Sequence, residues 1–592
     1  MSLTKAQRIV LSYPPIKQRL EKNESDQQKI LKNLDEIKST FSKRSIGAVL
    51  KFLKVALKKI YENIHLELPD EVNFKELVKN NSVVLVPNHQ SHADYIALNY
   101  ALYSRFKIPI YIAGGINLNV FPIGKVFRES GCFFIRRSFS NDILYKLALE
   151  GYLFYLLSEG KPIEFFFEGG RSRSGKLLPP RYGLFQMLSV AHGHIPAEKK
   201  KKLLFLPVSI MHEYVPEQKT LTRELGGAKK KKESTKELLK VFQILRYKLG
   251  SIHIRLSNPI NFNLQPNIET KNQIRELAFN CFRSVGLQMI ITPTALVSLI
   301  LLDEPEGALK STEIVDKAKR IVKYCQKFKV PLAKSLDNFD TLDESISNAL
   351  GILVGNKKVD RIGNKSVGHV FFAIKENARC EILYFKNSIL HHFIVPWIIN
   401  SAWVNLFNGE FSTEKDLAKH LLKLRDQLKF EFYLPTTAKT LVRAFRVISY
   451  STGKQVYNLK DCLNLNHEEL MKVGREVGIF SRSHKYILEN YFVSALAIKA
   501  IYTDKENSFR IDNFIKKSKE VFESERSLGR VIRHPEAFTL PVIKNGLKYF
   551  ENLEILKNDL GLYVISRVAK LDEEIVYLER ELELQTKLVF KG

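Results

Sequence analysis

Short apolar runs alternate with helix-like runs between residues 80 and 265, and this alternation constrains the fold more than any other feature of the sequence. Tyr95–Tyr103 and Leu144–Leu157 are the clearest helix-like runs. The candidate strands are Val83–Val86, Ile108–Ala113, Cys132–Ile135, Ile163–Phe167, Leu203–Ile210 and Ile252–Leu256. Strands that alternate with helices predict an α/β domain with a mostly parallel sheet and flanking helices, whose functional loops follow the carboxyl ends of the strands.

The chain of 592 residues is too long for one ordinary core, so we expect more than one domain. We predict an N-terminal helical region over 1–75, the α/β domain over 76–265 and a mostly α-helical C-terminal domain over 266–592. The C-terminal prediction rests on apolar residues that recur about every 3.6 positions. Its clearest periodic runs are Thr312–Val330, Leu417–Phe430 and Glu574–Leu588.

The charge of the chain is unusual for a globular protein. Hydrophobic residues make up 45% and charged residues 26%, which is ordinary for a folded chain. However, 92 Lys and Arg stand against 63 Asp and Glu, which gives a net charge of +29. Such an excess favours an anionic partner, which can be nucleic acid, anionic lipid or a phosphorylated substrate. Composition does not choose among these three.

The cysteines and the apolar stretches bear on where in the cell the chain is expected to fold and whether it crosses a membrane. The five cysteines are scattered and none forms a C-x-x-C pair, so neither a disulfide framework nor a structural zinc site is indicated. The first twenty residues lack an apolar signal core, and we expect a reducing cytosol. The most apolar stretches are Pro293–Leu302, which is too short to span a bilayer, and Ser388–Phe407, which polar residues interrupt. We therefore expect no conventional transmembrane helix.

The stretch VPNHQSHADY, residues 86–95, contains His89 and Asp94 between a candidate strand and a helix-like run. On an uninterrupted helix these two residues would lie roughly 140° apart, at about 100° per residue. If His89 lies on the loop and Asp94 in the first turn of the helix, the chain can fold back. The carboxylate can then bind one imidazole nitrogen and leave the other to act as a base.

Two other interpretations of these residues are open at this point. Ser91 and Asp94 fit a helix capping box, in which the aspartate is structural. His89 and His92, together with Asp94, also have side chains that suit zinc or iron.

Two further apolar runs end in arginines. Gly131–Arg137 (GCFFIRR) ends in an arginine pair, and Phe165–Gly175 (FFFEGGRSRSG) contains Glu168, two glycines, Arg171 and Arg173. Guanidinium groups bind phosphate through paired hydrogen bonds, and glycines let the backbone approach a ligand closely. A solvated arginine pair and a basic glycine turn are the structural alternatives.

Pro207 and the lysine runs give weaker signals. Pro207 lies within an apolar run and predicts a sheet edge or a pocket wall, because proline cannot donate to a β-ladder. Lys199–Lys202 and Lys229–Lys232 are typical of solvated loops, although they could also bind a phosphorylated ligand or an acidic protein.

Ser45–Asn63 predicts an amphipathic helix with a broad apolar face and a lysine-rich arc. Such a helix can lie in a membrane interface, or it can pack as a surface helix on the next domain. Both interpretations are open, and Ser388–Phe407 is the second candidate for a membrane anchor. The lysines of the arc are Lys51, Lys54, Lys58 and Lys59.

Together these stretches resemble the glycerol-3-phosphate 1-O-acyltransferases of the bacterial membrane-associated type, which are related to the mitochondrial enzymes and to dihydroxyacetone-phosphate acyltransferases. The resemblance is strongest over residues 80–260 and weaker around Phe385–Phe407. The segments that carry it are VPNHQSHADY, AGGINLNVFPIGKVFRESGCFFIRR, FFFEGGRSRSGK, PVSIMHEY and ELGGAKKKKES.

Carried over position by position, the resemblance implies His89 as the catalytic base and Asp94 as its orienting partner. Gly131, Phe134 and Arg137 match its second motif block. Glu168, Gly169 and Arg171 match the block that contacts glycerol 3-phosphate, Arg173 is a further candidate for the phosphate, and Pro207 matches the block associated with the acyl donor. The family often carries Ser or Cys just before the histidine, where this chain has Asn88.

The function implied by the resemblance is acyl transfer from acyl-CoA or acyl-carrier protein to the sn-1 hydroxyl of glycerol 3-phosphate. This is the first step of phospholipid synthesis, and we expect a peripheral protein on an anionic membrane surface, at the cytoplasmic face of the cell inner membrane. No metal, no cofactor and no nucleic-acid partner is expected. Dihydroxyacetone phosphate is the alternative acceptor. A basic, non-enzymatic protein that binds nucleic acid or anionic lipid is the alternative from another class.

Overall fold

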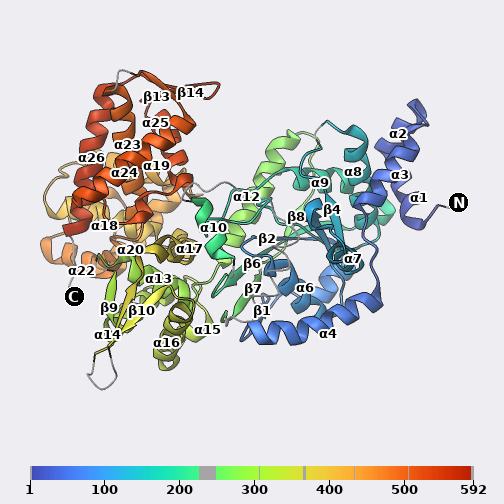
Figure 1. Ribbon diagram of the computed structural model, residues 1–592, viewed down its shortest axis with the longest axis horizontal. Helices are drawn as coiled ribbons and strands as arrows, with labels where there is room; N and C mark the ends of the chain where they lie inside the picture. Colours follow the sequence, from blue (N-terminus) through green and yellow to red (C-terminus); the bar gives the residue numbers. More distant parts are fainter. Residues whose placement is uncertain are drawn as a thin grey trace. The chain divides into compact units, whose positions relative to one another are not determined.

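The computed structural model groups the chain into two compact units (Figure 1). The first unit comprises Met1–Ser172, Leu177–Pro216 and Lys231–Ile290, and the second comprises Arg173–Lys176, Glu217–Lys230 and Ile291–Gly592. The boundaries predicted at residues 75 and 265 stay a prediction. The structure describes residues 3–139, 141–215, 217–225, 249–305, 307–363, 369–432, 434–503 and 506–587.

One mostly parallel sheet organises the first unit (Figure 1). Its strands are β1 (Ile64–Glu67), β2 (Asn81–Pro87), β3 (Tyr111–Gly115), β4 (Cys132–Ile135), β5 (Ile163–Glu164), β6 (Lys202–His212), β7 (Ile252–Leu256) and β8 (Ile260–Phe262). They follow the order β1-β7-β6-β2-β5-β3-β4, and β8 also pairs with β6. β6 pairs antiparallel with β7 and with β8, and the other pairings in this sheet are parallel. The predicted α/β class with a mostly parallel sheet is confirmed.

The strands β1 and β8 were not predicted. The sequence pattern assigned β1 to a helical region and gave no signal for β8. Both strands are short and only partly buried. They therefore lack the continuous apolar run that marks the central strands.

The helix α8 is the most buried helix that packs beside the sheet. Its buried residues include Tyr145, Leu149 and Leu153, and α1, α3 and α9 pack against it. The helices of the first unit are α1 (Lys5–Leu11), α2 (Pro14–Lys22), α3 (Asp26–Ile37), α4 (Lys43–Ile60), α5 (Phe74–Asn80), α6 (Ala93–Phe106), α7 (Ile123–Glu129), α8 (Ile143–Ser158), α9 (Gly183–Gly193) and α12 (Thr270–Gln288).

Pro207 lies inside β6, so the predicted position at a sheet edge is wrong. It pairs with Val86 of β2 on one side. Its carbonyl accepts a hydrogen bond of 2.9 Å from the N–H of Ser257, in the short break between β7 and β8. The N–H and C=O of a strand residue point to the same side of the strand. A residue other than proline would therefore direct its N–H towards the break between β7 and β8, where the ladder is already interrupted, so proline removes no ladder hydrogen bond there.

The second unit is mainly helical, as predicted, but it also contains two antiparallel sheets of three strands. These are β10-β11-β9 and β12-β14-β13, with strands of three or four residues that gave no clear signal in the sequence. The strands are β9 (Ala308–Lys310), β10 (Val359–Ile362), β11 (Phe371–Ile374), β12 (Ser508–Arg510), β13 (Leu556–Asp559) and β14 (Leu562–Ile565). The longer helices are α13 (Pro293–Asp303), α14 (Ser311–Phe328), α16 (Phe339–Gly355), α17 (Arg379–Ile389), α18 (Ile394–Phe407), α19 (Glu414–Leu428), α20 (Thr437–Thr452), α22 (His467–Val477), α23 (Lys485–Thr503), α24 (Ile511–Leu528), α25 (Leu540–Asn552) and α26 (Val568–Lys587). The short helices are α10 (Gln218–Leu225), α15 (Lys334–Asp337) and α21 (Leu459–Leu463).

The two most apolar stretches of the sequence form core helices of the second unit. Helix α13 is buried from Pro293 to Leu301, and most of α18 is buried as well. The apolar stretch Ser388–Phe407 therefore serves the core and does not present a membrane anchor. Within the described residues, no helix combines the length and the apolar character needed to cross a bilayer.

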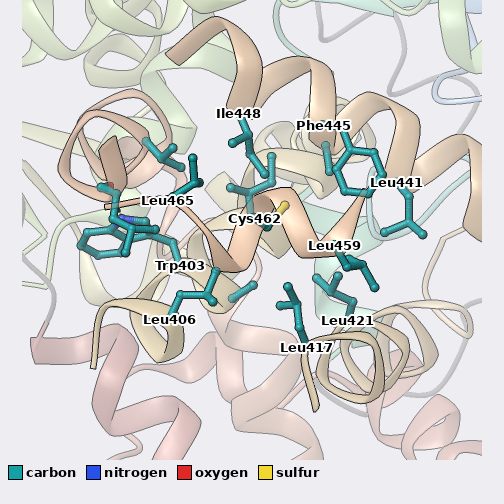
Figure 2. Close-up of a pocket in the computed structure, with 15 residues that line it drawn as sticks. Trp403, Leu406, Leu417, Leu421, Leu441, Phe445, Ile448, Leu459, Cys462 and Leu465 are labelled. Atoms are coloured by element: carbon teal, nitrogen blue, oxygen red, sulfur yellow. Dashed lines mark hydrogen bonds between the residues drawn. The ribbon is translucent and has the colours of Figure 1, made fainter. Parts of the chain in front are cut away.

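Buried ion pairs and one apolar cavity also mark the second unit. Lys176 Nζ lies 2.5 Å from a carboxylate oxygen of Glu431, and both side chains are buried. The cavity, of about 30 Å³, lies among α18, α19, α20, α21 and α22 (Figure 2). Trp403, Leu417 and Cys462 are among the side chains that line it. A water would fit by volume, but the apolar lining offers it no partner, so we expect the cavity to be dry.

Candidate active site

The loop between β2 and α6 brings His89 and Asp94 together. β2 ends at Pro87 and α6 begins at Ala93, so His89 lies on the loop and Asp94 in the first helical turn. Nδ1 of His89 lies 2.8 Å from Oδ2 of Asp94. The predicted contact between the two side chains is therefore confirmed.

Asp94 is fully buried and accepts four hydrogen bonds. Oδ2 accepts from His89 and from the backbone N–H groups of Gln90 at 2.6 Å and Ser91 at 2.9 Å, and Oδ1 accepts from Nε2 of His212 at 2.6 Å. Burial by itself would raise the pKa of Asp94, but the hydrogen bonds from the two histidines lower this pKa below its usual range. Asp94 is therefore a carboxylate, and each imidazole donates an N–H to it.

The tautomer of His89 follows from this bond. Because Nδ1–H donates to Asp94, the lone pair of the neutral ring lies on Nε2, and no partner for Nε2 occurs among the described residues. The ring packs against Phe166 with centroids 4.1 Å apart, and 13% of the side chain is exposed. Such an imidazole can accept a proton from the hydroxyl of a bound ligand.

Glu168 anchors the histidine loop from the turn that follows β5. One carboxyl oxygen accepts the backbone N–H of His89 at 2.8 Å, and the other accepts the backbone N–H of Leu178 at 3.1 Å. The side chain is buried, and burial raises the pKa of Glu168 well above its usual value. The predicted contact between Glu168 and substrate stays a prediction.

Asn88 extends the pairing of β2 with β6 through its side chain. Nδ2 donates to the carbonyl of Ile210 at 3.0 Å, and Oδ1 accepts the N–H of Ile210 at 2.7 Å. A serine or cysteine, common at this position in the family that the sequence resembles, has a single polar atom, whereas the Asn88 amide donates and accepts through two separate atoms. Asn88 thus fixes the backbone immediately before His89.

Two residues near Asp94 were missed in the sequence. His212 ends β6 and is buried, and a histidine in a run as apolar as PVSIM was the only available signal. Glu164 on β5 is buried between Ile163 and Phe165 and accepts a hydrogen bond of 2.7 Å from Asn99. Burial raises the pKa of Glu164 to about 8. Neither residue could be placed without knowing that β2 lies between β5 and β6.

The two arginines after β4, Arg136 and Arg137, lie in different surroundings. Arg136 binds Glu36 through Nε at 2.7 Å and Nη2 at 2.6 Å, and it binds Asp142 through Nη1 at 2.9 Å. It therefore ties three segments of the first unit together. Arg137, the one predicted to bind substrate, is exposed at the end of the strand. Its phosphate-binding role stays a prediction.

Arg171 and Arg173 belong to different units. Arg171 is partly buried and precedes Ser172, whose N–H donates to the carbonyl of His89 at 2.8 Å. Arg173 begins the segment Arg173–Lys176 of the second unit. The predicted binding of phosphate by these arginines also stays a prediction.

Gly131, Phe134 and Gly169 contribute to local packing. Gly131 has φ +113°, and a Cβ there would lie 2.5 Å from the carbonyl of Ile110. Phe134 is fully buried, with the guanidinium of Arg128 4.8 Å above its ring. Gly169 has φ +69°, which favours glycine. Substrate contacts at these three positions, and a pocket wall at Pro207, stay predictions.

The capping interpretation holds in part. Asp94 accepts the N–H of Ser91, but the Ser91 hydroxyl accepts the N–H of Ala93 at 3.0 Å. Asp94 thus both stabilises the helix start and orients His89. The third residue of the metal interpretation, His92, contacts the Tyr95 hydroxyl at 3.4 Å. Within the described ranges, no group of three or more His, Cys, Asp or Glu side chains is arranged to hold a metal ion.

The two lysine runs differ in what the structure describes. Lys199–Lys202 is exposed, and Lys201 donates to the carbonyl of Lys79 at 2.6 Å. Lys229–Lys232 lies outside the described residues, together with most of the segment ELGGAKKKKES.

Two family models match the chain. Residues 70–211, which include the site, match the Acyltransferase family. Residues 222–559, more than half of the chain, match the glycerol-3-phosphate acyltransferase C-terminal region. The chain belongs to the glycerol-3-phosphate acyltransferase family. The acyltransferase match covers β2 to β6 of the sheet, and the second match covers most of the helical unit.

Three relatives named glycerol-3-phosphate acyltransferase show how far this family resemblance extends. The protein of Haemophilus influenzae (strain PittEE) is 28% identical over 80% of this chain and 59% of its own length. That of Histophilus somni (strain 129Pt) is 26% identical over 93% and 70%, and that of Pseudomonas aeruginosa (strain LESB58) is 32% identical over 68% and 49%. The chain thus spans about half to two thirds of the length of these relatives.

A solved structure is also similar to part of the chain. The 1-acyl-sn-glycerophosphate (LPA) acyltransferase PlsC from Thermotoga maritima is 17% identical with a TM-score of 0.25, covering 40% of this chain and 78% of that one. This similarity is too weak to support any conclusion about the present member of the glycerol-3-phosphate acyltransferase family.

Proposed function

We propose that the chain transfers a fatty acyl group from acyl-CoA or acyl-carrier protein to the sn-1 hydroxyl of glycerol 3-phosphate, giving 1-acyl-sn-glycerol 3-phosphate. The observation that carries this proposal is the bond of 2.8 Å between His89 and Asp94, which fixes Nε2 of His89 as the basic nitrogen. The names of the curated relatives support glycerol 3-phosphate as the acceptor. The reaction would be the first step of phospholipid synthesis.

The mechanism needs no nucleophile from the protein. Nε2 of His89 takes the proton of the acceptor hydroxyl while its oxygen attacks the thioester carbonyl, and Asp94 stabilises the imidazolium that forms. The tetrahedral intermediate then expels the thiolate, and His89 returns the proton to the sulfur. General base catalysis of this kind contributes roughly 10²–10⁴-fold to the rate.

The acceptor phosphate would be held by arginines at the carboxyl ends of the strands. Arg137 follows β4, and Arg171 follows the turn after β5. Guanidinium groups match the oxygens of a phosphate in pairs and so fix the approach of the hydroxyl to His89. Arg173 is a further candidate for this role.

The decisive test is transfer of a palmitoyl group from palmitoyl-CoA by the purified full chain. We expect His89→Ala to lower kcat by about 10² or more, because the general base is lost. His92→Ala is the matched control, since this neighbouring histidine contacts the Tyr95 hydroxyl. Full activity of His89→Ala would contradict the mechanism.

The same assay decides the acceptor. Dihydroxyacetone phosphate also presents a phosphate and a primary hydroxyl, so it is offered beside glycerol 3-phosphate with one acyl donor. Faster transfer to dihydroxyacetone phosphate would contradict the proposed acceptor and leave the catalytic roles of His89 and Asp94 intact.

We also propose that the protein binds an anionic membrane surface, on the cytoplasmic side of the inner membrane, through α4. The helix packs on its own unit with Ile46 and Leu57, which are buried. Its outer face presents Phe52 and Val55, which are 54% and 59% exposed. Lys51, Lys54, Lys58 and Lys59 are exposed on the same helix. Both sequence interpretations of this helix thus find support, and apolar burial and lysine charge would act together at the head groups.

Co-sedimentation with vesicles that contain phosphatidylserine tests this surface. We expect Phe52→Ser with Val55→Ser to weaken binding about tenfold or more, because two exposed apolar side chains no longer enter the interface. Val442→Ser, at a 66% exposed apolar residue of α20, is the control for a general loss of surface hydrophobicity. Equal binding of the double variant and the wild type would contradict the proposal.

A further inference from the structure

The carboxylate of Asp94 is shared by two imidazoles from different strands. Its Oδ2 binds His89 after β2, and its Oδ1 binds Nε2 of His212 at 2.6 Å at the end of β6. Both Asp94 and His212 are buried without any exposed side-chain surface. The bond is therefore part of the built site and not an accident of a mobile surface side chain.

The protonation state of His212 follows from its surroundings. Nε2 faces the Asp94 carboxylate and must carry a proton to donate. Nδ1 is buried and meets no hydrogen-bonding partner within the described part of the chain. A second proton on Nδ1 would place an unpaired N–H in the interior, which costs free energy. His212 is therefore a neutral donor.

Groups from other elements also face this pair. The ring of Tyr61 lies 6.2 Å from that of His212, centroid to centroid. Glu164 from β5 and Glu168 from the loop after it are close enough to interact electrostatically with Asp94. Burial raises the pKa of both carboxyl groups, to about 8 for Glu164, so Glu164 does not add a full negative charge near neutral pH.

We propose that His212 is a positioning residue for the transferase reaction: it fixes the orientation of Asp94 and withdraws part of its negative charge, and so it sets the basicity of Nε2 in His89. This inference rests on the proposed function. Without the second donor, the charge of Asp94 would favour the protonated form of His89 more strongly. His89 would then be blocked by a proton at a higher pH than in the wild type.

The pH dependence of kcat separates this role from a purely structural one. We expect His212→Leu to lower kcat about tenfold or more and to move its acidic limb to higher pH, while the KM for each substrate changes little. His212→Gln places an amide donor where Nε2 was, and we expect it to restore most of kcat and the wild-type limb. Ser209→Ala, at another buried residue of β6, controls for disturbance of the strand.

Each outcome bears on the proposal. The proposal would be overturned if folded His212→Leu had the wild-type kcat and an acidic limb at the wild-type pH. It would also be overturned if His212→Leu lost kcat without a shift of the acidic limb and His212→Gln did not restore kcat. If the leucine variant does not fold, ¹⁵N-histidine NMR of the wild type decides. We expect the proton of His212 on Nε2, where the Asp94 carboxylate accepts it. A proton on Nδ1 with none on Nε2 would overturn the proposal. Absence of transfer by the wild type would instead contradict the proposed function, while the NMR result would still test the bond.

Discussion

At the scale of single residues, the site shows how the number of donors decides the charge of a buried carboxyl group. Asp94, Glu164 and Glu168 are all buried. Burial opposes ionisation in each, but Asp94 accepts four hydrogen bonds, two of them from imidazoles, and its pKa falls. Glu164 accepts one from Asn99, and burial raises its pKa to about 8. The stability that Asp94 contributes is thus present above its ordinary pKa and is lost as the pH falls towards the lowered value.

The raised pKa of Glu164 predicts that this residue has the opposite effect on the pH dependence of stability. Its pKa is raised from 4.5 to about 8, so the folded state holds a proton that the unfolded chain releases. The free-energy penalty of burying this group is absent below about pH 4.5 and complete above about pH 8, where it amounts to roughly 5 kcal/mol. We expect Glu164→Gln to raise the thermal midpoint at pH 8.5 and to leave it nearly unchanged at pH 5. The exposed Glu198→Gln is the control, and an equal gain at both pH values would contradict the argument.

At the scale of elements, the central strands were predictable and their neighbours were not. β4 and β7 were predicted with their observed bounds, since β4 is a compact apolar run and β7 alternates apolar and polar residues. The predicted Ile163–Phe167 shortens to Ile163–Glu164 in β5, because the chain turns towards the Glu168 loop. The placement of β6 beside β2 depends on contacts between distant parts of the sequence. For the same reason the bond between His89 and Asp94 was predicted, whereas the bond between Asp94 and His212 was not.

The apolar cavity in the second unit makes a stability prediction for α19. Leu417 lines the cavity and is 2% exposed. Leu417→Ala enlarges a void that the surrounding helices already fail to fill, so we expect a loss of about 2–5 kcal/mol. Thermal unfolding of the purified chain measures the effect. Leu422→Ala, at a 47% exposed position of the same helix, should change little, and equal effects of the two variants would contradict the cavity argument.

At the scale of the whole molecule, the thiols are shielded in both units. All five cysteines are free in the structure. Burial raises the pKa of Cys132, Cys380 and Cys462 to about 12, and that of Cys281 and Cys325 also lies well above its usual value. The thiolate is the reactive form, so the folded chain should react slowly with thiol reagents.

Titration with Ellman's reagent checks this expectation. At pH 7.5 the native thiols should react about 1000-fold more slowly than the thiol of glutathione, because far fewer of them are ionised. After unfolding in guanidinium chloride, all five should react at ordinary rates. Fast reaction of two or more thiols in the native protein would show that the units open readily in solution.

The ion pair of Lys176 with Glu431 has a consequence for protein synthesis. The two residues are 255 positions apart. At about 5–20 residues per second, a ribosome makes Glu431 roughly 13–50 s after Lys176. During that interval the segment Arg173–Lys176, which follows the Ser172 that bonds to His89, lacks the partner against which it is buried. The segment Arg173–Lys176 therefore reaches its buried state only after a further 255 residues have been translated.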